Sequence, residues 1–351
     1  MVQILKASFE ETLRKHVLPS SCVGCASCVV VCPFNCLEYV DEKPFLLREC
    51  KSCGVCAQVC PRYNLSIPEL EKFVYNRERR DNEDFGIYRK IVFAQTTDQN
   101  IKRVCQDGGI ITSLLIYALN EGYIDGAVLS SVSETEPLKA VPKLATAAKD
   151  ILDCAGTRYT YSPNMIALKE GILQKKKKLA FVGTPDQIQA VRKIQTLPLK
   201  KFSDAIALTI GVFCSECFTY EGLIKQLLHN ELGINIAEVA KINIKGKLLV
   251  TTKSGNVKEI ALKEAKKYVR NCIVQCSDFS SELADMSVGG LGLEDWTLTI
   301  LRTEKAEELF WKADSNGVIR TRPIEDEKAL DLLVKLSRKK RVGLSATKLT
   351  L

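Results

Sequence analysis

Apolar residues follow two periodicities in the part of the chain that begins near residue 89. Short continuous apolar runs, which are typical of buried strands, alternate with stretches where apolar residues recur every three or four positions, as on one face of a helix. Strands are predicted at 90–95, 126–131, 177–183 and 205–213, and helices at 109–122, 185–195 and 219–233. The alternation predicts a largely parallel sheet covered by helices.

Apolar and polar positions alternate strictly further along, which is the period of a half-buried strand. Residues 238–247 and 248–256 show this alternation, with a glycine-containing turn between them. Two such runs joined by a short turn predict a β-hairpin. The body is therefore predicted to be α/β with an antiparallel addition, which gives a mixed sheet.

The N-terminal part of the chain is dominated by cysteine. The segments CVGCASCVVVCP at 22–33 and CKSCGVCAQVCP at 50–61 both match the pattern C-x2-C-x2-C-x3-C-P. In two-cluster bacterial ferredoxins, three cysteines of one such run and the fourth of the other hold each 4Fe-4S cluster. One cluster is thus predicted to take Cys22, Cys25, Cys28 and Cys60, and the other Cys32, Cys50, Cys53 and Cys56. Structural zinc needs only four thiolates per site and leaves the three-cysteine runs unexplained.

Three regions follow from these patterns and together predict an α+β protein. Residues 1–67 form a small two-cluster ferredoxin-type domain with an N-terminal helix, and a domain of this size needs its clusters for much of its folding free energy. Cys36 lies outside the motif and is expected to be a packing thiol. Residues 68–88 are charged, so we expect an exposed connecting helix or linker there. Residues 89–351 form the α/β body.

The composition limits the classes of protein to which this chain can belong. Of the 351 residues, 46% are hydrophobic, yet no apolar run reaches the length of about 18 to 20 residues that a membrane span needs. Glu10 and Glu11 interrupt the N-terminal apolar segment, which excludes a signal peptide. Fifteen cysteines with metal-ligand spacing indicate a reducing compartment. We therefore expect a cytoplasmic protein with no membrane span of its own.

The formal net charge of +8 does not indicate a nucleic-acid partner, because no aromatic-rich basic module or recognition motif accompanies it. Lysine and arginine gather at 175–178 and 338–341. We favour solvated helix ends as the interpretation of both runs. The alternative is attraction of an anionic ligand or partner.

Four further cysteines form two separated pairs, Cys214 with Cys217 and Cys272 with Cys276. If the fold brings the pairs together, four thiolates can hold either zinc or a third 4Fe-4S cluster, and spacing alone does not separate the two. We favour the cluster, because two clusters are already predicted and a third would extend an electron path.

Three predicted strand-to-helix junctions are rich in glycine and hydroxyl groups. They are CQDGGIITSLL at 105–115, AGTRYTYSPN at 155–164 and FVGTPDQ at 181–187. Free backbone N–H groups at helix starts bind phosphate, and open α/β sheets bind ligands beyond the carboxyl ends of their strands. A nucleotide cofactor is therefore predicted, although neither G-x-G-x-x-G nor the Walker pattern occurs.

These junctions, with GVFC at 211–214 and C…CSDFSSELADMSVGG at 272–290, resemble the coenzyme F420 hydrogenase/dehydrogenase beta-subunit family. The resemblance covers essentially everything after residue 85. With a two-cluster ferredoxin module in front, the chain is similar to the electron-input subunit of F420H2 dehydrogenase. The resemblance implies FAD, coenzyme F420 as the hydride partner, and a 4Fe-4S cluster in the body.

The implied reaction is hydride transfer from reduced F420 to FAD, followed by single electrons through the body cluster and the two ferredoxin clusters to a partner protein. No catalytic side chain is implied, and His16 and His229 are expected at the surface. Arg158 stands where the family often has lysine, and the resemblance places it against a phosphate or the flavin ring. The residues implied to line the flavin are Gln106, Asp107, Gly108, Gly109, Thr112, Gly156, Thr157, Arg158, Tyr159, Ser162, Asn164, Gly183, Thr184 and Gln187.

The chain departs from the family at two places that bear on the third cluster. The family usually has GTPCQ where this chain has GTPDQ, so that Asp186 replaces a cysteine. Its later cysteine pair is usually C-x2-C, whereas Cys272 and Cys276 have three residues between them. Either Cys217 supplies the missing thiolate, or Asp186 itself ligates iron and changes the potential of the cluster.

Several functions and partners fit the resemblance. The redox partner is a membrane-bound proton-pumping dehydrogenase, which would hold the protein at the inner face of the membrane, or a hydrogenase or formate dehydrogenase whose beta subunit this chain would be. Two other functions are a flavo-iron-sulfur reductase of another substrate and a non-catalytic electron carrier. Because F420 carries a phosphate and an acidic glutamyl tail, the lysines at 175–178 are candidates for its capture.

Overall fold

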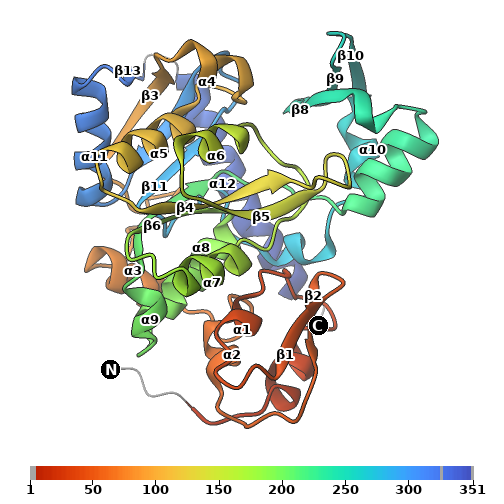
Figure 1. Ribbon diagram of the computed structural model, residues 1–351, viewed down its shortest axis with the longest axis vertical. Helices are drawn as coiled ribbons and strands as arrows, with labels where there is room; N and C mark the ends of the chain where they lie inside the picture. The colour runs from red at the N-terminus through yellow and green to blue at the C-terminus, as the bar shows by residue number, and fades with distance from the viewer. Residues whose placement is uncertain (1–4, 325–326, 349–351) are drawn as a thin grey trace.

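The computed structural model describes residues 5–324 and 327–348. Its centre is a mixed sheet with the order β13-β3-β12-β11-β7-β6-β4-β5 (Figure 1). The strands are β3 (Lys90–Thr96), β4 (Gly126–Val132), β5 (Ala140–Ala145), β6 (Leu179–Gly183), β7 (Ile206–Val212), β11 (Met286–Gly289), β12 (Thr297–Leu301) and β13 (Ile319–Arg322). The four apolar runs expected as strands form β3, β4, β6 and β7, so these predictions are confirmed.

Five strands of this sheet run in the same direction. β4, β6, β7 and β11 are parallel neighbours, and β3 points the same way because β12 is antiparallel to both β11 and β3. β5 and β13 are antiparallel strands at the two edges. The carboxyl ends of five strands therefore meet at one end of the sheet, where open α/β sheets bind ligands.

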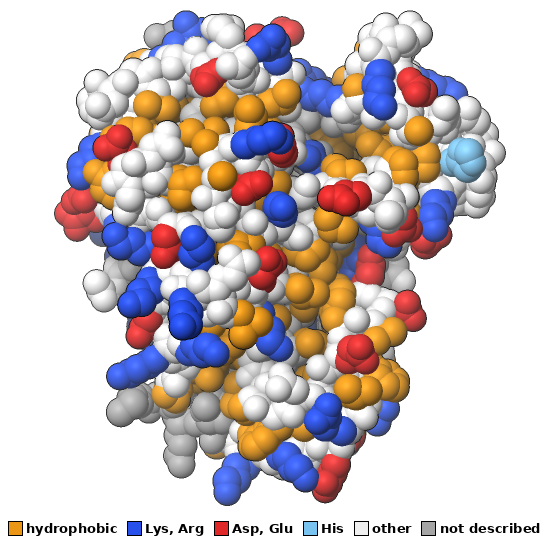
Figure 2. All heavy atoms as spheres, viewed as in Figure 1, with side chains coloured by type: hydrophobic (Ala, Val, Ile, Leu, Met, Phe, Trp, Pro, Cys, Tyr) orange, Lys and Arg blue, Asp and Glu red, His pale blue; other side chains and the backbone are white. Residues whose placement is uncertain are grey.

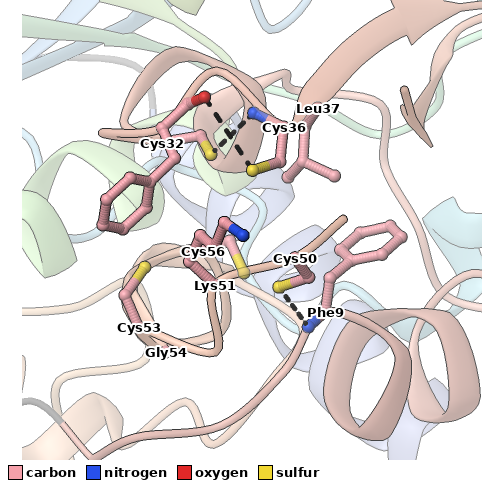
Figure 3. Close-up of a pocket in the computed structure, with 10 residues that line it drawn as sticks. Phe9, Cys32, Cys36, Leu37, Cys50, Lys51, Cys53, Gly54 and Cys56 are labelled. Atoms are coloured by element: carbon pink, nitrogen blue, oxygen red, sulfur yellow. Dashed lines mark hydrogen bonds between the residues drawn. The ribbon is translucent and has the colours of Figure 1, made fainter. Parts of the chain in front are cut away.

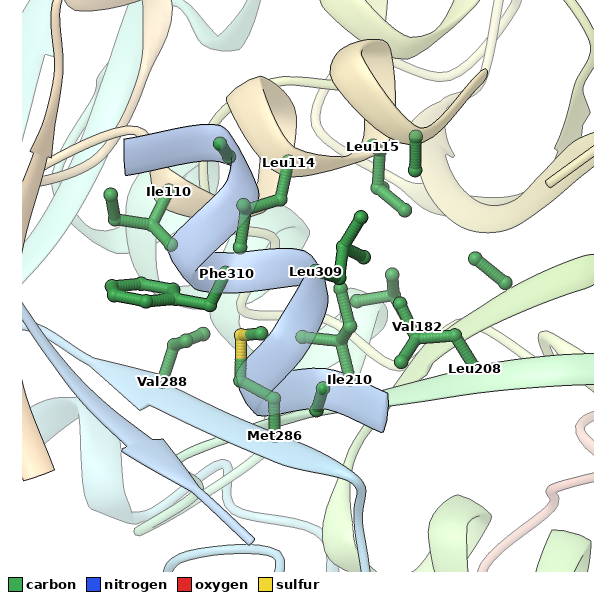
Figure 4. Close-up of a cluster of buried hydrophobic side chains, with 14 of the residues drawn as sticks. Ile110, Leu114, Leu115, Val182, Leu208, Ile210, Met286, Val288, Leu309 and Phe310 are labelled. Atoms are coloured by element: carbon green, nitrogen blue, oxygen red, sulfur yellow. The ribbon is translucent and has the colours of Figure 1, made fainter. Parts of the chain in front are cut away.

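Helices cover both faces of the sheet (Figure 1). One face carries α5 (Ile110–Asn120), α6 (Ala148–Asp153) and α11 (Glu304–Ser315), and the other carries α7 (Met165–Leu173), α8 (Pro185–Thr196) and α9 (Lys200–Ser203); α4 (Gln99–Val104) follows β3. Figure 4 shows how the first layer is held, with Leu114 of α5 and Phe310 of α11 packed over Ile210 and Met286 of the strands. Removing these apolar side chains from water is the main source of stability for the layers.

The cysteine-rich N-terminal region packs on the second helical layer. It contains η1 (Glu10–Arg14), α1 (Ser27–Val30), α2 (Val55–Val59) and a hairpin of β1 (Leu37–Val40) and β2 (Lys43–Leu46). Val30 of α1 and Val59 of α2 are buried in one cluster with Leu168 of α7 and Ile188 of α8. The region therefore shares a hydrophobic core with the body.

The segment that joins the two parts is anchored by buried charges, so the expectation of an exposed linker is correct for only part of it. On its helix α3 (Ile67–Tyr75), Glu71 is 2% exposed and pairs with Arg79 at 2.5 Å. Arg79 also pairs with Glu282 of the body, and the hydroxyl of Tyr75 donates to the backbone oxygen of Glu282 at 2.7 Å. Buried charges persist only when they are paired, and these pairs attach the segment to the body.

Residues 239–261 form a second, separate sheet. Its strands β8 (Val239–Lys245), β9 (Lys247–Thr252) and β10 (Val257–Ala261) are antiparallel neighbours. The predicted hairpin is confirmed as β8 and β9, with the turn at Gly246. It does not extend the main sheet, because it packs with η2 (Tyr220–Glu231) and α10 (Leu262–Lys266) around a core of its own. His229 is exposed on η2 and His16 is exposed near the N-terminus, as expected.

The two basic runs have different surroundings. On the last helix, α12 (Glu327–Lys348), Arg341 pairs with Glu282 at 2.7 Å, and Lys340 donates to the backbone oxygen of Cys214. A solvated helix end is therefore the wrong interpretation for these two residues. The lysines at 175–178 immediately precede β6, so they lie at the amino end of this strand, opposite the carboxyl ends where a ligand is expected. Within the described ranges, no helix is both long and apolar enough to cross a membrane.

One buried cation ties three parts of the body together and gives a test of the fold. Arg302, which follows β12, is 1% exposed and donates to Ser287 Oγ at 2.7 Å, to the backbone oxygen of Ile87 at 2.8 Å and to that of Ser280 at 3.2 Å. Arg302→Met leaves these acceptors unpaired. We expect it to lower the free energy of unfolding by about 3–5 kcal/mol, measured by urea unfolding under anaerobic conditions.

The matched control is Arg338→Met on α12, which removes a pair between exposed Arg338 and Asp84. Exposed pairs contribute about 0–1 kcal/mol, so this variant is expected to unfold nearly as the wild type does. Equal losses in the two variants would contradict the role given to Arg302.

Candidate functional site

Nine cysteines of the N-terminal region line two separate cavities. We call the four around the first cavity centre 1, and they are Cys22, Cys25, Cys28 and Cys60. The four motif cysteines around the second cavity, shown in Figure 3, are centre 2, and they are Cys32, Cys50, Cys53 and Cys56. Cys36, which is outside the motif, also lines the second cavity, and its thiol donates to the backbone oxygen of Glu49 at 3.2 Å. Each cavity joins three cysteines of one run to the fourth of the other, which is the ligand arrangement of a two-cluster ferredoxin.

Backbone amides point at the sulfurs of both centres. The N–H of Arg62 donates to Cys60 Sγ at 3.4 Å in centre 1, and the N–H of Phe9 donates to Cys50 Sγ at 3.3 Å in centre 2. Hydrogen bonds of this kind to cluster sulfurs help to set the reduction potential. The donor to Cys60 comes from the turn that ends the second cysteine run, whereas the donor to Cys50 comes from Phe9 at the start of η1, far away in the chain.

The chemistry of these thiols fits a metal centre. Burial, and next the neighbouring thiols, raise the pKa of Cys25 and Cys56 to about 12. A thiol that ligates a metal is deprotonated outright, so the bound group must supply the positive charge that these apolar surroundings lack. No three Cys, His, Asp or Glu side chains in the described part of the chain converge on a single metal ion. The four motif cysteines around each cavity suit the larger 4Fe-4S group.

A third group of sulfurs, which with Asp186 we call centre 3, lies inside the body. Cys214 and Cys217 follow β7, Cys272 lies in η4 (Asn271–Gln275), and Cys276 follows it; all four are buried. Asp186 is in the first turn of α8 and is 3% exposed. Burial, then the Cys214 thiol and the Asp186 carboxylate, raise the pKa of Cys217, which places the three groups together.

The structure brings both alternatives for the fourth ligand to the same place. Asp186 Oδ2 accepts a hydrogen bond from the hydroxyl of Tyr161 at 3.1 Å, and the Asp186 carboxylate also raises the pKa of Cys272 after burial. Cys217 is buried among the same residues. The Asp186 carboxylate and the Cys276 thiol also raise the pKa of Cys214 after burial, so five candidate ligands lie in one buried neighbourhood, and a 4Fe-4S cluster takes four.

Three cations that sequence reasoning missed surround centre 3. Arg62 donates to the backbone oxygen of Gln275 at 3.3 Å, and Lys340 donates to that of Cys214. Arg270 donates to the backbone oxygen of Val23 at 3.2 Å. Net charge near a cluster sets its potential. Two of these cations could have been identified from the sequence, because Arg62 is two residues after Cys60 and Arg270 is two residues before Cys272.

The three centres adjoin one another. Cys25 of centre 1 packs in one buried cluster with Cys214, Cys217 and Cys272 of centre 3. Centres 1 and 2 meet in another buried cluster, which contains both Cys28 and Cys56. The thiols therefore form a continuous series from the interior of the body to the N-terminal region.

The residues implied to line a flavin fall into two groups. The first contains Gln106 to Gly109 and Gly156 to Tyr159, and it faces β8 of the small sheet. Lys241 of β8 donates to the backbone oxygen of Gln106 at 3.1 Å, and the hydroxyl of Tyr159 accepts the N–H of Ile244 at 3.2 Å. We call this place the β8 crevice, and Figure 2 shows the surface hollowed between the small sheet and the body.

Two polar atoms at the β8 crevice are buried without a hydrogen-bond partner among the described residues. They are Gln106 Oε1 and Arg158 Nε. An unpaired buried polar atom costs about 1–3 kcal/mol, so each marks a place where a ligand atom would be bound. Gly108 next to them packs directly on the main sheet, because a Cβ there would lie 2.5 Å from the backbone oxygen of Ala94 in β3. The positive charges of Arg158 and Lys241 suit a phosphate-bearing ligand.

The second group contains Ser162, Asn164, Gly183, Thr184 and Gln187, and it lies deeper. Gln187 donates to the backbone oxygen of Ser162 at 2.6 Å and accepts the N–H of Thr184 at 3.2 Å. Asn164 donates to the backbone oxygen at the end of β6 at 2.9 Å. These bonds shape the turn that carries Asp186, so this group adjoins centre 3. Thr112 is buried on α5, and Thr157 is exposed.

The sequence matches one family over most of the body, that of “Coenzyme F420 hydrogenase/dehydrogenase, beta subunit”. Residues 91–169 match the N-terminal part of this family's sequence pattern, and residues 176–327 match its C-terminal part. Residues 16–38 match a 4Fe-4S binding domain.

Individual relatives agree with this match. The beta subunit of coenzyme F420 hydrogenase from Methanococcus voltae is 38% identical over 73% of this chain and 92% of its own length. The F subunit of F(420)H(2) dehydrogenase from Methanosarcina mazei is 31% identical over 92% of this chain and 90% of its own. Coenzyme F420-dependent sulfite reductase of Methanocaldococcus jannaschii is 34% identical over 92% of this chain and 51% of its own.

A solved structure shows the same fold. A chain in the F420-reducing [NiFe] hydrogenase complex from Methanosarcina barkeri superposes with a TM-score of 0.73 and 36% sequence identity, covering 77% of this chain and 94% of its own. The sequence matches, the relatives and this structural similarity together show that the chain belongs to the coenzyme F420 hydrogenase/dehydrogenase beta-subunit family.

Proposed function

We propose that this protein oxidises reduced coenzyme F420 by hydride transfer to FAD, and that the electrons leave one at a time through three 4Fe-4S clusters to a partner redox complex. Membership of the family makes the chain an oxidoreductase subunit that works with F420. The single observation that carries the finer proposal is the unbroken series of contacts from the β8 crevice through centre 3 and centre 1 to centre 2.

The first contact of this series joins the crevice to centre 3. Cys217 Sγ lies 3.8 Å from the backbone oxygen of Tyr159, whose hydroxyl lies at the crevice. Two residues further along, the hydroxyl of Tyr161 reaches Asp186. One short segment therefore lines both sites, which supports their use in one reaction.

The residues of the β8 crevice fit a flavin nucleotide. A bound flavin supplies the conversion between a hydride, which carries two electrons, and the single electrons that clusters accept. Arg158 and Lys241 offer positive charge to its phosphates, and Gln106 Oε1 offers an acceptor to a ring or ribose donor. No side chain has to form a covalent bond, so these residues bind and orient.

The clusters would be held by the residues of the three centres. Centres 1 and 2 each supply four thiolates, and centre 3 supplies Cys214, Cys272 and Cys276 with Cys217 as the fourth. Amides such as that of Arg62 would then donate to ligated sulfur. The half-buried cysteines of centre 2 place it nearer to solvent than centre 3, so we propose that the partner complex receives electrons there.

The extent of the relatives favours the F(420)H(2) dehydrogenase type over the hydrogenase type, while the coenzyme F420-dependent sulfite reductase also matches 92% of this chain and is not separated from the dehydrogenase by extent. The hydrogenase beta subunit of Methanococcus voltae matches 73% of this chain, whereas the F(420)H(2) dehydrogenase chain of Methanosarcina mazei matches 92%. A match of that length includes cysteine-rich sequence as well as body. A beta subunit of an F420-reducing hydrogenase or a formate dehydrogenase is the alternative that an assay of the purified protein must also address.

One anaerobic preparation tests the proposal. We expect about twelve irons and one FAD per chain, since each cluster holds four irons. Mixing with reduced F420 should bleach the flavin absorbance and restore the absorbance of oxidised F420. A preparation with full iron but no flavin would indicate an electron carrier, and a flavin that reduced F420 does not bleach would indicate another substrate. Either result would overturn the proposal. Adding hydrogenase or formate dehydrogenase large subunits would address the alternative partner.

The fourth ligand of centre 3 can be identified by iron content. We expect Cys217→Ala to lose about four irons per chain, because thiolate is the usual ligand of 4Fe-4S clusters. Asp186→Asn should keep all of them, because its amide retains a hydrogen-bonding partner for Tyr161. Cys154→Ala, which removes a buried thiol outside the three centres, is the control. Loss of iron in the Asp186 variant alone would make the carboxylate the ligand.

Binding of FAD tests the crevice separately. Arg158→Met removes a charged donor whose Nε has no other partner among the described residues, and such a hydrogen bond contributes about 1.5–3 kcal/mol. We therefore expect the dissociation constant of FAD to rise about tenfold or more, measured by fluorescence titration, with the iron content unchanged. Arg103→Met, on the exposed face of α4, should bind FAD as the wild type does.

A further inference from the structure

Arg62 links two of the centres, although it belongs to neither set of ligands. Its backbone N–H donates to Cys60 Sγ of centre 1 at 3.4 Å. Its side chain crosses into the body, where Nη1 donates to the backbone oxygen of Gln275 at 3.3 Å, next to Cys276 of centre 3. The two ends of one residue therefore contact the immediate surroundings of both centres.

The guanidinium of Arg62 has donors left over. Nε and Nη2 are buried and have no hydrogen-bond partner in the described ranges. Burial alone would lower the pKa of Arg62, but the Cys276 thiol and the Asp186 carboxylate outweigh burial and raise it. Unpaired buried donors of a charged group are costly, and the one acceptor that Nη1 reaches, the backbone oxygen of Gln275, is next in sequence to Cys276 of centre 3.

Two other buried cations at this junction have several partners, although Arg270 Nε is itself buried without one among the described residues. Arg270 forms an ion pair with Glu42 and packs over the ring of Tyr161 at 4.5 Å. Lys193 donates to the backbone oxygens of Cys60, Tyr63 and Asn64 at 2.8, 2.6 and 3.3 Å. Arg62, in contrast, is in no ion pair among the described residues, so its charge is directed at the centres.

We propose that Arg62 is a positioning residue of the electron path, whose backbone holds a sulfur of centre 1 while its guanidinium donates to sulfurs of centre 3 and raises the reduction potential of centre 3. The inference rests on the proposed function only in requiring that the centres hold clusters. A fixed positive charge stabilises the reduced cluster, which is the more negative form, and hydrogen bonds to its sulfurs act in the same direction.

The experiment measures reduction potentials in the full chain, without FAD or F420. Anaerobic titration followed by electron paramagnetic resonance gives a potential for each cluster, and Cys272→Ala identifies the signal of centre 3 by its loss. In Arg62→Gln we expect a shift of centre 3 to more negative potential. Centre 1 should shift less, because its bond comes from the backbone. Arg48→Gln, an exposed arginine of the same region, should shift neither.

A second variant covers the case in which Arg62→Gln fails to hold its full iron. Arg62→Lys keeps the charge and loses the planar pair of donors, so centre 3 should shift in the same direction by a smaller amount. Full iron content with an unchanged centre 3 potential in either variant would overturn the inference. Neither flavin nor F420 takes part in these titrations. An unchanged centre 3 potential would therefore not contradict the proposed reaction. A failure of the protein to oxidise reduced F420 would likewise leave the measured potentials valid.

Discussion

The packing of the N-terminal region against helices α7 and α8 is the contact on which the rest of the structure depends. Val30 and Val59 are buried there with Leu168 and Ile188, and Lys193 of α8 donates to three backbone oxygens that follow the second cysteine run. Burial lowers the pKa of Lys193 to about 8, so its charge is maintained against a real desolvation cost. This contact fixes Cys25 beside Cys214 and Cys217, and the separation of centre 1 from centre 3 is thereby set by hydrophobic packing.

The sheet supplies the second constraint. Because five strands share one direction, the turns after β3, β6, β7 and β11 gather at one end of it, and these turns carry Gln106, Asp186 and Cys214. The small sheet then covers this end from outside through Lys241 and its bonds to the chain after β3. The β8 crevice and a buried group of thiols thus occupy neighbouring parts of a single edge, which is a common location for function in open α/β sheets.

Local patterns in the sequence were enough for the elements that depend on local rules. Continuous apolar runs gave β3, β4, β6 and β7, and the hairpin of β8 and β9 followed from alternation and a glycine turn. The grouping of the eight motif cysteines around two cavities follows from their spacing, because short loops leave few ways for thiols to converge. The family motifs pointed to the junctions at 105–115 and 155–164, which the structure brings to the crevice.

Charges were predicted less well, because burial of a charge depends on partners far away in the chain. Glu71 and Arg341 look like solvent-exposed residues in their own segments, yet both belong to the buried charges around Arg79 and Glu282. The burial of Arg62 likewise depends on residues far away in the chain, because its side chain donates to the backbone oxygen of Gln275 in the body.

The packing of the N-terminal region on the body also controls access to centre 3. Cys25, Arg62 and Lys340 cover the buried thiols of centre 3, so we expect metal ions or reagents from solvent to reach these thiols only when the N-terminal region moves away from the body.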